Sequence, residues 1–130
     1  MAASYLGMAS ALAERVLAAG RADAAERAGI AVELEAAMGL VTGVARGMRL
    51  GLLGEPAFAE ALVCRFAVQD AIARAVRRCV EALGGMAYIG SSDVPYLAAC
   101  TAALAFHPPS RARMSVPLCD YFQGAPLRVS

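Results

Sequence analysis

Apolar residues recur every three or four positions along nearly the whole chain, and the alternation that is typical of strands is sustained nowhere. Spacing of this kind is typical of helices that bury one stripe of side chains. Glycine and proline interrupt the pattern at helix-length intervals, which places the helix ends. The pattern predicts an all-α protein: an up-and-down bundle of about four helices in a single domain, residues 1–130.

The first half of the chain predicts two helices. We expect one over about residues 4–19, with Ser4 as its N-cap and Gly20 as its stop. The second is expected from residue 21 or 22 to about residue 53. The sequence leaves open whether these two segments form one bent rod that is broken near Gly20.

A third helix is predicted to begin near Pro56, because Gly51 and Gly54 break the pattern just before it and proline suits the first turn of a helix. It is expected to run to Leu83, where Gly84 and Gly85 stop it. Six apolar positions follow helical spacing and define its expected buried stripe: Leu62, Phe66, Ala73, Val76, Val80 and Leu83.

A fourth helix is expected to start at Ser92 or Asp93, with Pro95 in its first turn, and to reach about Phe106. From about residue 108 onward we expect an irregular tail. Because Pro117 lacks a backbone N–H, the sequence predicts at most a helical turn over about residues 111–114.

Composition adds an expectation about partners. Apolar residues make up 59% of the chain, against roughly 45–50% in ordinary soluble domains. A small domain with this excess is expected to bury some surface against another chain, as a homo-oligomer or on a larger subunit. The formal net charge is only +1, and Asp70–Arg74 and Arg77–Glu81 are spaced to pair along one helix, so nucleic acid is not an expected partner.

The sequence also favours a cytoplasmic protein that does not enter a membrane. The N-terminus has no basic lead, so it does not resemble a signal peptide. The longest stretch without a formal charge, residues 94–110, is interrupted by prolines and is shorter than a membrane span. The four cysteines are widely separated and there is one histidine, which favours reduced, buried thiols and argues against a zinc site or a disulfide framework, so no metal is expected.

Four glycines recur at every fourth position of the second predicted helix and so share one stripe: Gly39, Gly43, Gly47 and Gly51. Each costs about 1 kcal/mol relative to alanine inside a helix, so a compensating contact is expected. We favour close packing of a neighbouring helix, including packing across a dimer interface. The alternative is a groove for a flat ligand or an acyl chain.

Residues 78–110 read RCVEALGGMAYIGSSDVPYLAACTAALAFHPPS. This stretch resembles the C-terminal helical domain of acyl-CoA dehydrogenases. In that family a helix ends in Gln-x-x-Gly-Gly-x-Gly-Tyr, and the next helix carries Tyr-Leu-Arg-Asp before Tyr-Glu-Gly-Thr-Ser. The positions that match are Gly84, Gly85, Tyr88, Tyr96 and Leu97.

The resemblance implies that much of the family's chemistry is missing. His107 stands where the family has its catalytic Glu, Ala98-Ala99 replace Arg-Asp, and Glu81 replaces the Gln. A neutral imidazole can accept a proton near pH 7. For His107 we nevertheless favour a helix-end residue whose ring bonds a free carbonyl.

The resemblance also suggests where a cofactor could touch the chain. In the family this bundle contacts the FAD pyrophosphate of a neighbouring subunit, which makes Arg65, Gln69, Glu81, Gly84 and Gly85 the candidate cofactor-binding positions. For Arg65 and Gln69 a hydrogen bond between helices is the favoured alternative. The family's N-terminal and middle β-domains have no counterpart here, so the isolated chain is expected to bind no cofactor, and FAD only with a partner subunit.

Three hypotheses about function follow. The first is an acyl-CoA dehydrogenase-like domain encoded alone, a subunit or remnant of an FAD-dependent oxidoreductase that acts on acyl thioesters. The second is a non-enzymatic helical module for dimerisation or interaction. The third is a small enzyme repurposed around His107. Whether the chain is itself an enzyme stays open; the isolated chain is expected to be inactive.

Overall fold

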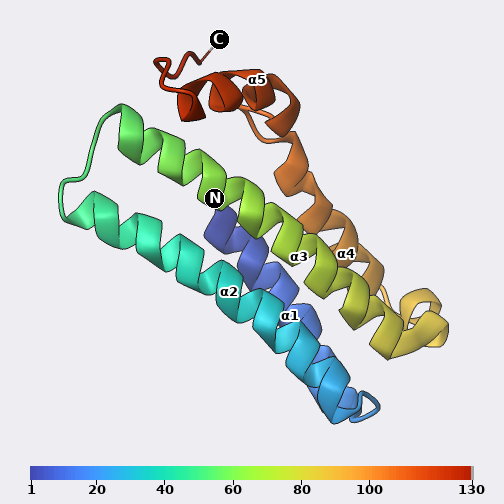
Figure 1. The fold of residues 1–130 in the computed structure, drawn as a ribbon. Helices are drawn as coiled ribbons and strands as arrows, with labels where there is room; N and C mark the ends of the chain where they lie inside the picture. Colours follow the sequence, from blue (N-terminus) through green and yellow to red (C-terminus); the bar gives the residue numbers. More distant parts are fainter. Residues whose placement is uncertain (130) are drawn as a thin grey trace.

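The computed structural model describes residues 1–129, and in that range all regular secondary structure is helical, with no strand. The elements are α1 (Ala2–Ala19), α2 (Ala24–Arg49), α3 (Glu55–Gly90), α4 (Asp93–Ala102), a 3-10 turn (Ala103–Phe106) and α5 (Arg111–Phe122). The first four helices lie alongside one another and α5 crosses one end of them (Figure 1). The predicted all-α bundle is confirmed.

α1 and α2 are separate helices rather than one bent rod. Gly20 adopts the left-handed conformation (φ 63°) that ends α1, and Asp23 then caps α2. The Asp23 carboxylate accepts from the Glu26 N–H, while the Glu26 carboxylate accepts from the Asp23 N–H, which forms a capping box. Ser4 is not an N-cap, because α1 already begins at Ala2.

The turn between α2 and α3 begins earlier than predicted. α2 ends at Arg49, and Gly51 and Gly54 both have positive φ (76° and 93°), which lies outside the right-handed helical region. Pro56 lies in the first turn of α3 as expected. Leu83 does end the regular part of α3, since Gly84 kinks the backbone (φ 80°), but helix resumes beyond it to Gly90 where only a turn was predicted.

One apolar core joins α1, α2, α3 and α4. Leu6, Leu12, Ile72 and Leu104 are its largest fully buried aliphatic side chains, and Cys79 is buried among them. The predicted stripe of α3 is right at Leu62, Phe66, Val76 and Leu83, half-buried at Val80 and wrong at Ala73, which is exposed. The buried face of α3 therefore differs from the predicted stripe, because α1 and α4 also pack on α3.

The charges on α3 pair between elements and not along the helix as predicted. Arg74 binds Glu33 of α2 through two hydrogen bonds of 2.8 and 2.9 Å. Asp70 instead pairs with Arg111 of α5 at 2.9 Å. Arg78 lies so close to Gly29 of α2 that a Cβ there would come within 2.9 Å of its Nη1 atom, so this glycine permits close helix contact.

The predicted irregular tail is wrong, because Arg111–Phe122 forms a helix that contains Pro117. The Ser110 side chain caps it by accepting from the Arg113 N–H. Met114 and Leu118 are buried against Leu62 and Phe66 of α3 in a second apolar cluster. A proline inside a helix costs about 3 kcal/mol, and burial of two large apolar side chains at about 1.5–3 kcal/mol each offsets that cost.

Within the described residues, α2 is the helix long and apolar enough to cross a membrane by length and composition. Little of its apolar stretch is buried in the bundle. The same helix carries Glu33, which binds Arg74 of α3. The expectation of a cytoplasmic protein without a membrane contact stays a prediction.

Candidate functional site

Tyr5, near the start of the chain, contacts His107, which follows the 3-10 turn. The Tyr5 hydroxyl oxygen lies 2.5 Å from His107 Nε2, and the two rings meet edge to face with centroids 5.4 Å apart. Both side chains are half-buried. His107 does end a helical turn, as expected, but its ring contacts the Tyr5 hydroxyl and not a carbonyl.

Arg65 fixes the segment that carries His107. Its guanidinium donates to the backbone carbonyls of His107, Pro108 and Pro109. These carbonyls follow the end of the 3-10 turn, where helix geometry leaves them without intrahelical partners. Arg65 therefore does form a hydrogen bond, as predicted, but its partner is the loop after the 3-10 turn and not another helix. Since the guanidinium is already engaged and partly desolvated, which lowers the pKa of Arg65, it is not presented to a phosphate.

Gln69 lies one turn beyond Arg65, and its Oε1 is buried without a hydrogen-bond partner. Phe66 lies between two guanidinium groups, with Arg65 5.0 Å and Arg111 5.3 Å from the ring centroid. Arg111 also donates to the Phe66 carbonyl. Through these contacts Arg65 and Arg111 stabilise the packing around Phe66, where α5 meets α3.

The predicted cofactor positions do not converge. Arg65 and Glu81 are 16 residues apart on one helix, or about 24 Å along its axis. Glu81 is exposed, Gly84 forms the kink and Gly85 lies in the helix beyond it. No cradle for a pyrophosphate forms from these residues, so they do not fit FAD by themselves.

The glycine stripe faces open space in this chain. A Cβ at Gly39 or Gly43 would meet nothing within 4 Å, and one at Gly47 would meet only Leu52 Cδ1 at 3.6 Å. Gly51 lies outside α2, in the turn, so it does not belong to the stripe. Close packing by a helix of the same chain is thus wrong as the explanation of this stripe, and packing against another chain stays a prediction.

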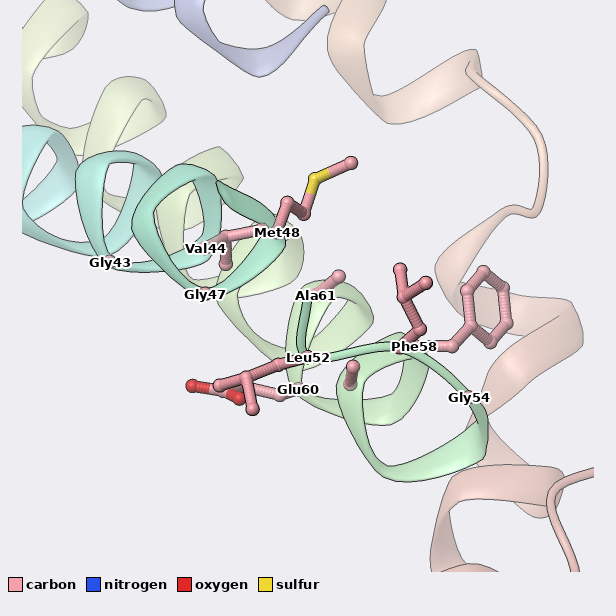
Figure 2. A pocket seen from close by; sticks show the side chains of 11 residues that line it. Gly43, Val44, Gly47, Met48, Leu52, Gly54, Phe58, Glu60 and Ala61 are labelled. Atoms are coloured by element: carbon pink, nitrogen blue, oxygen red, sulfur yellow. The ribbon is translucent and has the colours of Figure 1, made fainter. Parts of the chain in front are cut away.

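A pocket of about 340 Å³ opens beside Gly43 and Gly47. Figure 2 shows its lining residues distributed over the end of α2, the connecting turn and the start of α3. The lining is apolar apart from the carboxylate of Glu60. The other lining side chains include Val44, Met48, Leu52, Leu53 and Phe58.

The four cysteines are free, but only Cys79 is buried, and Cys119 is exposed. The expectation of buried thiols therefore holds for Cys79 and is wrong for Cys119. In the part of the chain that the structure describes, no group of three or more His, Cys, Asp or Glu side chains is placed to hold a metal ion.

Tyr5 is the site residue that sequence reasoning missed. It lies 102 positions from His107, so no local spacing links them. The available signal was a tyrosine beside the apolar stripe of the first helix, one position before the buried Leu6. A half-buried tyrosine of this kind needs a partner for its hydroxyl group.

Comparison with known proteins gives one relative of stated activity. The chain is 45% identical over 126 residues to the isobutylamine N-hydroxylase of Streptomyces viridifaciens. This match covers 97% of the chain but 33% of that enzyme, so the chain spans about a third of the length of the curated relative it matches. No known family model matches the chain, and no solved structure matches it. The chain is thus similar to a segment of an amine N-hydroxylase.

Proposed function

We propose that this chain is the helical domain of an enzyme that adds oxygen to the nitrogen of a small aliphatic amine. The observation that carries the proposal is the 45% identity, over nearly the whole chain, to an isobutylamine N-hydroxylase. It refines the first hypothesis: the oxidoreductase class is kept, and an amine takes the place of the acyl thioester.

The chemistry of the two reactions supports the change of substrate. Dehydrogenation of an acyl thioester requires a base that removes a proton from carbon, and a carboxylate serves that role in the family that the chain resembles. Oxygenation of an amine uses the nitrogen lone pair and removes no such proton. An enzyme of this second kind has no need of Glu at position 107, where this chain has His.

An amine substrate must instead lose a proton from its own nitrogen, and Tyr5 and His107 can take up that proton. Alkylammonium groups have a pKa of about 10.4, so the lone pair is protonated near pH 7. In the proposed step an ammonium N–H bond breaks as its proton passes to the Tyr5 oxygen. The Tyr5 hydroxyl proton passes at the same time to His107 Nε2, 2.5 Å away. The products are a neutral amine and an imidazolium, and total charge is conserved.

Proton transfer from an alkylammonium to an imidazole runs uphill, because an alkylammonium is ordinarily the weaker acid. Consumption of the neutral amine by the oxygenation draws the transfer forward. Arg65 holds the carbonyls of His107 and Pro108 and so keeps the imidazole at the tyrosine.

The redox component is proposed to lie outside these residues. Arg65 is engaged by carbonyls and Glu81 lies about 24 Å away, so these two residues do not form a flavin site together. We continue to propose that FAD binds only together with a partner subunit and that this partner is a larger flavoprotein subunit. We also propose that the isolated chain has no acyl-CoA dehydrogenase activity.

A chimera tests the function. The chain replaces the matching third of the Streptomyces viridifaciens enzyme, and hydroxylamine product from isobutylamine is measured by mass spectrometry. We expect hydroxylation. Tyr5→Phe in the chimera should lower the rate at neutral pH by about a hundredfold, since proton transfer contributes at least that much. Above about pH 9 the rate should recover, because the fraction of free amine is then about a hundredfold larger than at pH 7.

Arg113→Ala is the matched control, since Arg113 is exposed and its side chain has no described partner. A chimera that folds and retains its cofactor but yields no hydroxylamine would contradict the proposed function. An active chimera whose Tyr5→Phe form loses rate equally at all pH values would leave the reaction in place and remove the proton relay.

A further inference from the structure

We infer that the end of the α2–α3 hairpin is an interface with a second copy of this chain. This hairpin end is defined as Gly43–Ala61, the last turns of α2, the turn and the first turns of α3. The inference locates the expected oligomer contact on one surface and specifies how two copies meet. It is independent of the proposed amine chemistry.

The helix lengths leave the end of the α2–α3 hairpin uncovered by α1. α2 has 26 residues and α1 has 18, a difference of eight residues or about 12 Å. Figure 1 shows the N-terminus of α1 beside the middle of the α2–α3 hairpin, so the hairpin end extends past it. The buried residues of α2 are Ile30 and Ala37, and none lies in its last twelve residues.

The uncovered end is strongly apolar. Five large side chains there are exposed: Met48, Leu50, Leu52, Leu53 and Phe58, with Leu53 77% accessible. Four of them, Met48, Leu52, Leu53 and Phe58, line the pocket of about 340 Å³ that Figure 2 shows. A contiguous apolar surface with a pocket in it is typical of a protein–protein contact.

The total surface area supports a partner of substantial size. The chain exposes 7736 Å². A monomeric globular protein of 13.4 kDa is expected to expose about 6,500 Å². The surplus of about 1,200 Å² exceeds the roughly 800 Å² per partner that a standard interface buries. A second copy that covers the hairpin end can account for it.

The glycines permit the close approach that such a contact needs. No atom lies within 4 Å of a Cβ built at Gly43, and Gly47 meets only the flexible end of Leu52. A ridge of side chains from another helix can therefore reach the backbone of α2 here. This contact compensates the helix-destabilising cost that the two glycines impose.

The charges make this surface complementary to itself. Arg46 and Arg49 end α2, whereas Glu55 and Glu60 begin α3, and all four are exposed with no ion pair among the described residues. In a two-fold pair each surface meets its own copy turned by 180°. The arginines of one copy then face the glutamates of the other, which favours a second copy over an unrelated partner.

Sedimentation velocity over a wide range of concentrations tests the inference with the full chain. We expect a dimer that Leu53→Asp dissociates, with Kd raised about tenfold or more. Ile89→Asp is the matched control, because Ile89 is 82% exposed and lies at the other end of α3. It should remain dimeric. Circular dichroism checks that both variants keep the helical fold.

A charge exchange tests the pairing itself. One variant carries Arg46→Glu and Arg49→Glu, and the other carries Glu55→Arg and Glu60→Arg. Each alone should be monomeric through like-charge repulsion, and an equimolar mixture should form heterodimers. Three results would overturn the inference: a monomeric unaltered protein, a dimer that Leu53→Asp leaves intact, or variants that do not pair when mixed.

Discussion

At the scale of single residues, Tyr5 and His107 show how the site depends on contacts that are remote in sequence. The 2.5 Å contact joins α1 to the end of the 3-10 turn. Arg65 fixes the backbone of the same turn from α3. Two side chains from two other elements, α1 and α3, therefore set the position of this imidazole.

Replacing Tyr5 with Phe should release the His107 ring. Because Nε2 loses its hydroxyl partner, the tautomer balance of the imidazole is expected to change, and stability should fall by about 1 kcal/mol. Nitrogen NMR of labelled histidine gives the first quantity and urea unfolding the second. With a single histidine in the chain the signal needs no assignment. An unchanged histidine spectrum would contradict the contact.

The thiols should differ in reactivity because thiolate is the reactive form. Burial raises the pKa of the Cys79 thiol to about 11, whereas Cys119 is exposed. We expect iodoacetamide at pH 8 to modify Cys119 quickly in the native protein and Cys79 only after unfolding. Peptide mass mapping before and after addition of urea measures this order. Equal rates in the native state would refute it.

At the scale of elements, single backbone conformations decide where helices end and bend. Gly84 has φ 80° and ψ 165°, a region that is essentially restricted to glycine. The neighbouring Gly85 is helical and has open space around it. Two adjacent glycines thus have opposite roles, one required for the kink and the other replaceable.

Alanine at these two positions should give opposite effects. Gly84→Ala is expected to lower the free energy of unfolding by about 1–3 kcal/mol, because alanine is strained in the observed conformation. Gly85→Ala should be neutral or stabilise the protein by up to about 1 kcal/mol, since it favours helix. Urea unfolding of both variants measures the difference. Equal losses would show that Gly84 does not require positive φ.

At the scale of the whole molecule, charge pairs between helices hold the bundle in register. The Arg74 guanidinium donates to the Glu33 carboxylate, and this hydrogen bond lowers the pKa of Glu33 against the smaller opposing effect of burial. Arg15 of α1 pairs with Asp93 of α4 in the same way. The pairs connect α2 to α3 and α1 to α4, so they favour this arrangement of the four helices over others.

The Glu33–Arg74 pair should make stability depend on pH. Since the pKa of Glu33 is lower in the folded state, its contribution is present above the ordinary value of 4.5 and is lost as pH falls through the lowered value. Glu33→Gln should therefore reduce Tm at pH 7 and have a smaller effect at pH 3, where less of the carboxylate is charged. Glu35→Gln, at an exposed position of the same helix, is the control. A loss of Tm that is equal at both pH values would contradict the assignment.

The sequence determined what depends on local chemistry. Helical periodicity gave the fold class, and the positive-φ requirement of Gly20 and Gly84 and the ring of Pro56 placed helix ends close to where they occur. The resemblance to a redox family pointed to position 107. These features need only neighbouring residues or a matched pattern, so they are readable from the chain alone.

The tertiary structure decided what depends on contacts between distant elements. The α5 helix forms despite Pro117 because Met114 and Leu118 find Leu62 and Phe66 to pack against. The ring of His107 meets Tyr5, 102 residues away, and Arg65 binds carbonyls instead of presenting a free cation. Such contacts are set by the folded path of the chain, where burial and hydrogen bonding outweigh local propensity, and no spacing along the sequence encodes them.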